Sequence, residues 1–263
     1  MENAIFARGL QAFQEELRVH GYTMLVASTS YQPEREEEQI RTLVARGADA
    51  LLLIGHARAP EVYAFLEAQG VPSLVTWAYD PSAPRPSVGF DNAAAMALMA
   101  RAVLSEGHRR LALITASTIS NDRAQERQAG IKSAMQDAGL DPASLDVVET
   151  TYSIENGAAA FSTLMARSRP PTAVFCGNDV LAVGALRQAQ EMQIKVPDAV
   201  SIVGFDDIEL AQVAYPPLTT IHVPHREMGR RAAQTLVQML NDGQNATSVA
   251  LVPDLVVRST LGP

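Results

Sequence analysis

Cysteine is almost missing from these 263 residues, because Cys176 is the only one, and an internal disulfide framework is therefore excluded. Cys176 ends the apolar run Ala173–Cys176, where we expect a small buried side chain rather than a nucleophile. No run of roughly 18 apolar residues occurs, so the sequence predicts no membrane-spanning helix. The start Met1-Glu2-Asn3 shows no basic stretch followed by an apolar one. We therefore expect a cytoplasmic protein without a secretory signal there.

Positive charge is also scarce, since 21 lysines and arginines face 29 acidic residues and the net charge is −8. A nucleic-acid-binding surface requires a basic patch. The two short basic clusters, His108–Arg110 and Arg226 with Arg230-Arg231, lie at a helix end or on a helix face, where we expect solvated surface. We expect this chain alone to bind DNA only nonspecifically.

Motifs of catalysis are missing as well. The sequence contains no GxGxxG, GxxxxGK[ST] or GxSxG pattern. No two histidines have the i, i+4 spacing of a zinc site, and Pro224 interrupts the pair His222 and His225. The adjacent Asp206 and Asp207 would point to opposite sides of an extended chain, which disfavours shared acid–base work. We predict no enzyme, no catalytic residue, no metal site and no cofactor.

What the chain does contain is a repeated unit, in which an amphipathic helix ends at glycine and an apolar run follows. Glycine closes a helix in the left-handed conformation at little steric cost. Apolar runs without alternation are typical of parallel strands that are covered on both faces. The pattern therefore predicts an α/β fold with open, doubly wound parallel sheets. The runs are Tyr22–Ala27, Ala50–Ile54, Val71–Val75, Leu111–Thr115 and Val147-Val148.

Helices are predicted from apolar spacing and from their end signals. Proline in a first turn and an aspartate before a helix are both favourable. With 47% apolar residues, the length suits one large domain or two lobes of about 130 residues each. The predicted helices contain Ile5–Leu17, begin at Pro33, run over Ala93–Leu104 after the cap Asp91, run over Val180–Met192 after the cap Asp179, and open at Pro224 to close near Asn241–Gly243.

Several segments, in the same order along the chain, resemble the core of the LacI/GalR family of bacterial transcriptional regulators. The resemblance covers essentially the whole chain, and the segment Pro216–Ile221 is its most specific part. The other matching segments are Asn3–Ala7, Arg35–Gln39, Gly89–Asn92, Gly107–Leu111, Arg127-x-x-Gly130, Pro171–Asp179, Val203–Asp207 and Val256–Thr260.

The resemblance implies two Rossmann-like lobes of the periplasmic-binding-protein type, joined by three crossovers. We assign residues 1–89 and 223–251 to the N-terminal lobe, and residues 90–222 and 252–263 to the C-terminal lobe. A ligand is expected between the lobes, at the carboxyl ends of the strands. The family core opens with an apolar strand before the position of Asn3, preceded by a hinge and a helix-turn-helix headpiece. We do not find the strand, the hinge or the headpiece in this sequence. We therefore expect operator DNA to be bound only through a headpiece that lies outside it.

Two functions remain open. The first is the effector-sensing core of a regulator, and the second is a periplasmic solute-binding protein that feeds a sugar transporter. The segment Pro216–Ile221 and the terminal Arg258-Ser259-Thr260 favour the regulator. The family also implies a homodimer, since paired headpieces read a two-fold operator. A helix face with Val62, Phe65 and Leu66 could belong to the dimer interface or pack onto its own sheet.

The resemblance further implies a small polyhydroxylated effector, and similarity to the gluconate-sensing branch favours a sugar or sugar acid. Sugars offer an apolar ring face and a fringe of hydroxyl groups, which suit aromatic plates together with charged and amide groups. Arg127 would bridge hydroxyls or bind a carboxylate; the alternative is a surface arginine. Asp206 would accept from hydroxyls; the alternative is a cap on the next helix. The candidate ligand-binding residues are Phe6, Trp77, Asn121, Arg123, Arg127, Tyr152, Asn178 and Asp206.

Overall fold

The computed structural model describes residues 6–243 and 246–263, which form two compact units. Of the described residues, unit 1 contains 6–91, 120–122, 224–243 and 246–252, and unit 2 contains Asn92–Ile119, Arg123–Val223 and Pro253–Pro263. The grouping of Ser120–Asp122 with unit 1 has no signal in the sequence. No helix of the described part is both long and apolar enough to cross a membrane.

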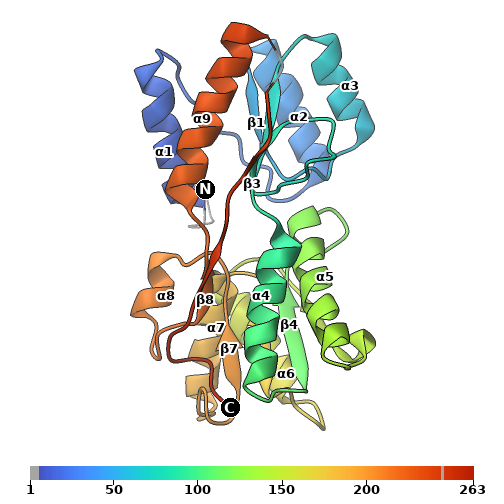
Figure 1. Ribbon diagram of the computed structural model, residues 1–263, viewed down its shortest axis with the longest axis vertical. Coiled ribbons are helices and arrows are strands. Elements are labelled where there is room, and N and C mark those ends of the chain that lie inside the picture. Colours follow the sequence, from blue (N-terminus) through green and yellow to red (C-terminus); the bar gives the residue numbers. More distant parts are fainter. Residues whose placement is uncertain (1–5, 244–245) are drawn as a thin grey trace. The chain divides into compact units, whose positions relative to one another are not determined.

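The centre of unit 1 is a four-stranded parallel sheet in the order β1-β2-β3-β9 (Figure 1). Helices α1 and α9 lie side by side against one face, while α2 and α3 cover the other (Figure 1). Gly229 permits the close packing of α1 and α9, because a Cβ there would lie 2.0 Å from the Gly9 carbonyl oxygen. The elements are β1 (Leu51–Ile54), β2 (Ser73–Thr76), β3 (Ser87–Gly89), β9 (Val249–Ala250), α1 (Ala7–Val19), α2 (Pro33–Ala45), α3 (Pro60–Ala68) and α9 (His225–Asp242).

The strand predicted over Tyr22–Ala27 is wrong, because no strand is present there. A strand requires a hydrogen-bonded neighbour, and no strand of the described chain pairs with this segment. The side chains of Leu25 and Val26 are accordingly 64% and 51% exposed. High β-propensity alone therefore did not decide the structure of this segment.

Unit 2 contains a second parallel sheet in the order β5-β4-β6-β7. Helices α6 and α7 pack together over a core that includes Phe161, Leu181 and Ile202, and Cys176 is buried in it as expected. Burial raises the pKa of the Cys176 thiol. The elements are α4 (Asn92–Ser105), β4 (Leu111–Thr115), α5 (Asp122–Asp137), the 3-10 turn η2 (Pro142–Ser144), β5 (Asp146–Glu149), α6 (Ile154–Met165), β6 (Ala173–Cys176), α7 (Asp179–Glu191), β7 (Ser201–Val203) and α8 (Glu209–Val213).

An antiparallel pair, β8 (Thr220–His222) with β10 (Asp254–Val256), adds to the parallel sheet of unit 2. Single bridges from Val203 to Thr219 and from Asp206 to His222 place β8 alongside the end of β7 and the segment that follows it. The α/β architecture with parallel sheets is confirmed, and this pair is a local addition to it.

The sequence signals for α2 and α9 are confirmed, and the one for the start of α7 is not; Ile5, in the first predicted helix, lies outside the described residues. Helix α2 begins at Pro33, and α9 follows Pro224 and ends before Gly243 at φ 88°. The predicted cap Asp179 is wrong, because Asn178 is the N-cap and its side chain accepts from the Leu181 N–H. The Asp179 carboxylate instead accepts from the Ile208 N–H and the Thr220 hydroxyl.

The helix face considered for a dimer interface packs onto its own sheet. Val62 and Leu66 are buried in the core of unit 1, beside Ile40 and Leu53. Phe65 is half-buried, and the Arg41 guanidinium lies 4.3 Å above its ring. The packing alternative is therefore confirmed for Val62 and Leu66.

Candidate functional site

Arg127 of α5 is buried, with 6% of its surface exposed, so the alternative of a surface arginine is wrong. Its Nε donates to Asn92 Oδ1 at 2.9 Å, and its Nη1 donates to the Gly177 carbonyl at 2.5 Å. The guanidinium lies 3.7 Å from the centre of the Phe205 ring. A buried guanidinium is stable only with such partners, and the planar group is held in one orientation by them.

Gly130 explains how α5 brings Arg127 to these partners. A Cβ at Gly130 would lie 2.1 Å from the Ala93 carbonyl oxygen and 3.0 Å from the Ala97 nitrogen. Helix α5 therefore approaches α4 backbone to backbone, one turn from Arg127. This contact places Arg127 beside Asn92, the first residue of α4.

Asp206 lies next to Arg127 and is 1% exposed, with 4.0 Å between its Oδ1 and Arg127 Nη2. Its side chain does not cap α8, because the N-cap of that helix is Ile208 without a side-chain bond. The extended chain assumed at Asp206-Asp207 is wrong, since both residues have positive φ, 104° and 52°. Asp207 has other partners, Arg258 at 2.6 Å and His222 at 3.0 Å. The two carboxylates thus serve different contacts.

Asn178 is fully buried directly after Gly177, whose carbonyl accepts from Arg127. The Asn178 Oδ1 accepts from Leu181 N at 2.9 Å, and its Nδ2 has no hydrogen-bond partner among the described residues. A buried amide donor without a partner is costly, so it is a candidate donor to a ligand. Arg127, Asn178 and Asp206 are therefore brought together where β6 and β7 end.

A second group of the predicted residues lies in unit 1. Phe6 and Trp77 form an edge-to-face pair with ring centres 5.0 Å apart, and His225 lies 6.2 Å from Trp77. Trp77 is 2% exposed and has φ 58°, which is rare for a bulky residue. Asn121 is buried in the same unit. The aromatic pair and Asn121 therefore belong to unit 1.

The remaining two predicted residues have weaker structural support. Tyr152 is half-buried and packs against the hydrophobic core of unit 2, as a core residue would. Arg123 is half-buried on α5, four residues before Arg127. In the described residues, no group of three or more His, Cys, Asp or Glu side chains is placed to hold a metal ion.

Sequence reasoning missed three residues of these clusters: Asn92, Phe205 and His225. Asn92 and Phe205 lie inside segments already singled out, Gly89–Asn92 and Val203–Asp207, but nothing in those segments indicates contact with Arg127. His225 was considered only with His222, from which it is separated into the other unit.

The pKa of Asp179 is raised well above its ordinary value, first by burial and then by the negative charge of Asp206. The folded chain therefore holds this proton more tightly than the unfolded chain. Stability from this group is full below the unfolded pKa and is lost as the pH rises through the folded pKa. Asn at this position keeps an acceptor for Ile208 and can donate to Thr220, without a charge.

We expect Asp179→Asn to unfold at a temperature several degrees above the wild type at neutral pH, because the variant folds without binding a proton or burying a charge at this position. The difference should shrink toward pH 4, where Asp179 becomes protonated in the unfolded chain as well. Circular dichroism melts from pH 4 to pH 8 measure this, with the exposed Asp137→Asn as the baseline for charge removal. A temperature difference that does not change with pH would contradict the account.

Comparisons with known proteins agree with this architecture. Residues 100–261 match the family described as periplasmic binding protein-like domain. The chain is 31% identical to the ribose operon repressor of Haemophilus influenzae, over 98% of this chain and 78% of that protein. It is 32% identical to the HTH-type transcriptional regulator GntR of Escherichia coli, over 94% of this chain and 73% of that protein.

Solved structures give the same result. A LacI family transcriptional regulator from Silicibacter pomeroyi is 28% identical with a TM-score of 0.89, covering 99% of this chain and 96% of that chain. The transcription regulator GntR from Chromobacterium violaceum is 28% identical with a TM-score of 0.91, and the match covers 99% of this chain and 96% of that chain. With this fold, these segments and these relatives, the chain belongs to the LacI family of transcriptional regulators.

Proposed function

We propose that this chain is the effector-sensing core of a LacI-type regulator and that its effector is a sugar or sugar acid. The relatives are transcriptional regulators, which favours this function over a periplasmic solute-binding protein. In this proposal the protein is not an enzyme and acts in the cytoplasm. The name of one relative, ribose operon repressor, supports the sugar class.

The observation that carries the proposal is the buried arginine–carboxylate arrangement of Arg127 and Asp206 in unit 2. The guanidinium is a fixed fork of donors, and the carboxylate 4.0 Å away is an acceptor. Adjacent hydroxyl groups of a sugar offer both an acceptor and a donor, and they fit such a pair. A sugar carboxylate would bind the same fork through two parallel hydrogen bonds. Asn178 supplies a further donor beside them.

Regulation requires that the effector bind two states of the protein with different affinity. In our proposal, closure on the effector biases the regulator between a state that binds operator DNA and one that releases it. The operator itself is contacted through a helix-turn-helix headpiece, as in relatives named HTH-type regulators.

A thermal-shift screen of sugars, sugar acids, purines and amino acids tests the effector class. A true effector stabilises the folded state by about 2.7 kcal/mol at a concentration 100 times its Kd. We expect a sugar or sugar acid to raise the unfolding temperature in proportion to the logarithm of its concentration. If only a purine or an amino acid did so, the carbohydrate assignment would be wrong.

We also propose a homodimer, and unit 2 offers an apolar surface for it. Val213, Tyr215 and Val257 are 77%, 88% and 62% exposed, and we call them the Tyr215 patch. The two segments of the patch are joined by a hydrogen bond from Ser259 N to the Pro217 carbonyl. Large exposed apolar side chains in one place are typical of protein interfaces.

We expect the wild type to sediment as a dimer at micromolar concentration and the double variant Val213→Asp/Tyr215→Glu to sediment as a monomer. Two buried charges at each copy of the interface would each lack a partner. Ile119→Glu, at a 93% exposed residue outside the patch, should leave the dimer intact. A wild-type monomer, or a double variant that remains dimeric, would count against this interface.

A further inference from the structure

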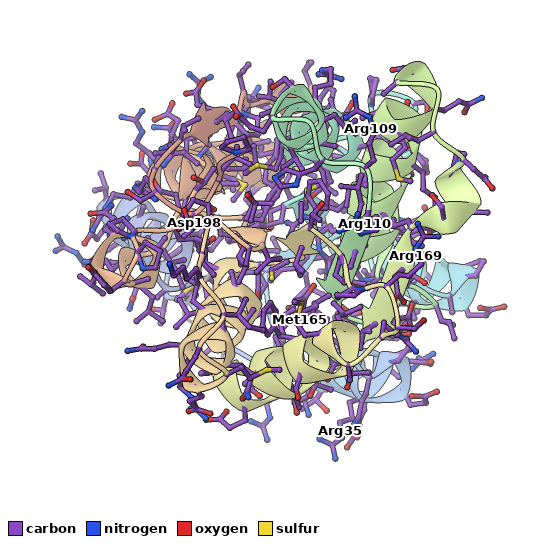
Figure 2. The ribbon with its side chains drawn as sticks, turned by 90° about the horizontal axis from the view of Figure 1, so that it is seen from below. Arg35, Arg109, Arg110, Met165, Arg169 and Asp198 are labelled. Atoms are coloured by element: carbon purple, nitrogen blue, oxygen red, sulfur yellow. The ribbon has the colours of Figure 1, made fainter. Side chains whose placement is uncertain are left out.

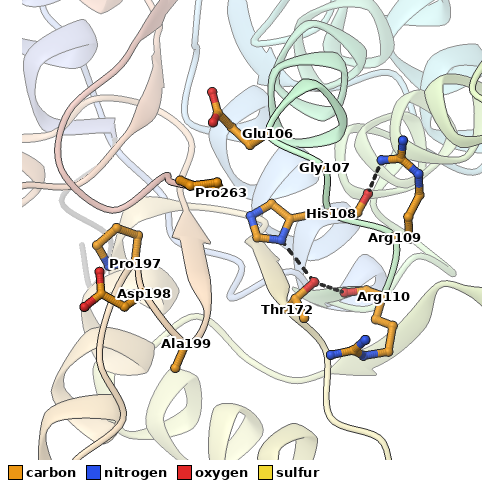
Figure 3. Close-up of a pocket in the computed structure, with 10 residues that line it drawn as sticks. All are labelled: Glu106, Gly107, His108, Arg109, Arg110, Thr172, Pro197, Asp198, Ala199 and Pro263. Atoms are coloured by element: carbon orange, nitrogen blue, oxygen red, sulfur yellow. Dashed lines mark hydrogen bonds between the residues drawn. The ribbon is translucent and has the colours of Figure 1, made fainter.

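Unit 2 contains a cavity of about 350 Å³ at the amino ends of its strands (Figure 3). This is within the size range of small-molecule sites. Its wall is built by the turn that precedes β4, by Thr172 just before β6, and by Pro197–Ala199 before β7. Arg127 and Asp206, by contrast, belong to the carboxyl ends of this sheet. The cavity is therefore separate from the effector site proposed above.

His108 lines the cavity. It was expected on the surface, but it is only 6% exposed. His108 Nε2 lies 2.8 Å from the Gly262 carbonyl oxygen and 3.0 Å from the Ser201 hydroxyl. Nδ1 of the same ring lies 3.0 Å from the Thr172 hydroxyl (Figure 3). Because both ring nitrogens are engaged, the histidine fixes the wall in place.

One side of the cavity carries arginine donors. Arg110 Nε donates to the Pro170 carbonyl at 3.0 Å, while its terminal amino groups have no partner among the described residues. Arg109 uses Nη1 for two carbonyls, those of Leu104 and His108. Arg169 is adjacent in sequence to Pro170, and Figure 2 shows it on the same side as Arg109 and Arg110. None of the three forms a salt bridge within the described chain, which is unusual in a protein with a net charge of −8.

The other side carries carboxylates. Glu106 and Asp198 line the cavity opposite Arg110, next to Pro197 and Pro263 (Figure 3). Carboxylates accept hydrogen bonds and repel anions, so this wall selects for hydroxyl groups. A ligand that fits both walls carries an anionic group at one end and hydroxyl groups at the other.

We propose that this cavity is a second small-molecule site, which binds a hydroxylated phosphate ester such as a polyol or sugar phosphate. The phosphate lies against Arg110 and Arg109, whose planar guanidinium groups match its oxygens. The hydroxyl groups lie against Asp198 and Glu106. The two sites are independent, so either proposal can fail alone.

Calorimetric titration tests the site, using glycerol 3-phosphate, glucose 6-phosphate, inorganic phosphate and glucose as probes. The titrations use the Arg127→Met variant, once circular dichroism has verified its fold, so that binding at the effector site is weak and does not mask binding in the cavity. We expect at least one ester to bind about tenfold more tightly than inorganic phosphate, and glucose not to bind. Arg110→Gln should weaken ester binding by about tenfold or more, the effect of losing hydrogen bonds to a charged group.

Two further variants separate the walls. Asp198→Ala should weaken binding of the ester but not of inorganic phosphate, since it removes a hydroxyl acceptor and a charge that repels anions. Arg187→Gln is the matched control, because this exposed arginine of unit 2 pairs with Glu191 on the α7 surface. The proposal is overturned if no ester binds, if glucose binds as well as its phosphate, or if Arg110→Gln and Arg187→Gln bind the ester equally.

Discussion

Arg127→Met is expected to weaken effector binding by about 10- to 150-fold, the range for losing hydrogen bonds to a charged group. Methionine fills much of the same space beside Phe205 but has no donor for the ligand, for Asn92 or for the Gly177 carbonyl. Asp206 would also lose the positive charge that lies 4.0 Å from its carboxylate. Both changes act on the groups that we propose to contact the sugar.

The measurement is calorimetric titration of the sugar or sugar acid found in the screen. Arg127→Lys should give a weak complex too, because an ammonium cannot reproduce the planar fork that reaches Asn92 and Gly177 together. Arg187→Met, at an exposed arginine of the same unit, is the control and should bind as the wild type does. Full affinity in the Arg127→Met variant would remove Arg127 from the site.

Gly130→Ala is expected to lower the free energy of unfolding by about 2–3 kcal/mol, although alanine favours helices more than glycine does. The new methyl group would lie 2.1 Å from the Ala93 carbonyl oxygen, which is backbone and cannot rotate away. Helices α4 and α5 must then separate, and the Arg127–Asn92 hydrogen bond should lengthen. Effector affinity should therefore fall together with stability.

Urea denaturation and effector titration on the same samples check this prediction. Gln125→Ala, at an exposed position of α5, is the control and should change stability by less than about 0.5 kcal/mol. A Gly130→Ala variant as stable as the wild type would show that α4 and α5 are not packed backbone to backbone.

Much of the fold could be predicted because its signals are local. Strands β1 and β4 coincide closely with the apolar runs, helix α2 begins at Pro33, and helix α9 begins directly after Pro224. The strand prediction over Tyr22–Ala27 was wrong because a strand also requires a hydrogen-bonded neighbour, which the local sequence does not specify. The cap of α7 failed by one residue, because the partners of Asp179 are 29 and 41 residues away.

The candidate site shows the same limit. The residue types of Arg127, Asn178 and Asp206 were predictable from the family segments, yet their contacts were not. Asn92 and Gly177 are 35 and 50 residues from Arg127, and no spacing rule links them. For His108 the prediction itself was wrong. The neighbouring arginines indicated solvated surface, but the ring is buried.

Amide hydrogen exchange with and without the effector tests the central claim most directly, because it locates the bound ligand on the chain. Asp179 N and Asp206 N donate to the Phe205 and Ile221 carbonyls, so exchange there reports on the strand ends that carry the proposed site. We predict slower exchange over residues 177–179 and 204–208 when a sugar or sugar acid is bound, and no change over residues 106–110. Slower exchange confined to residues 106–110, or absent from residues 177–179 and 204–208, would contradict the account.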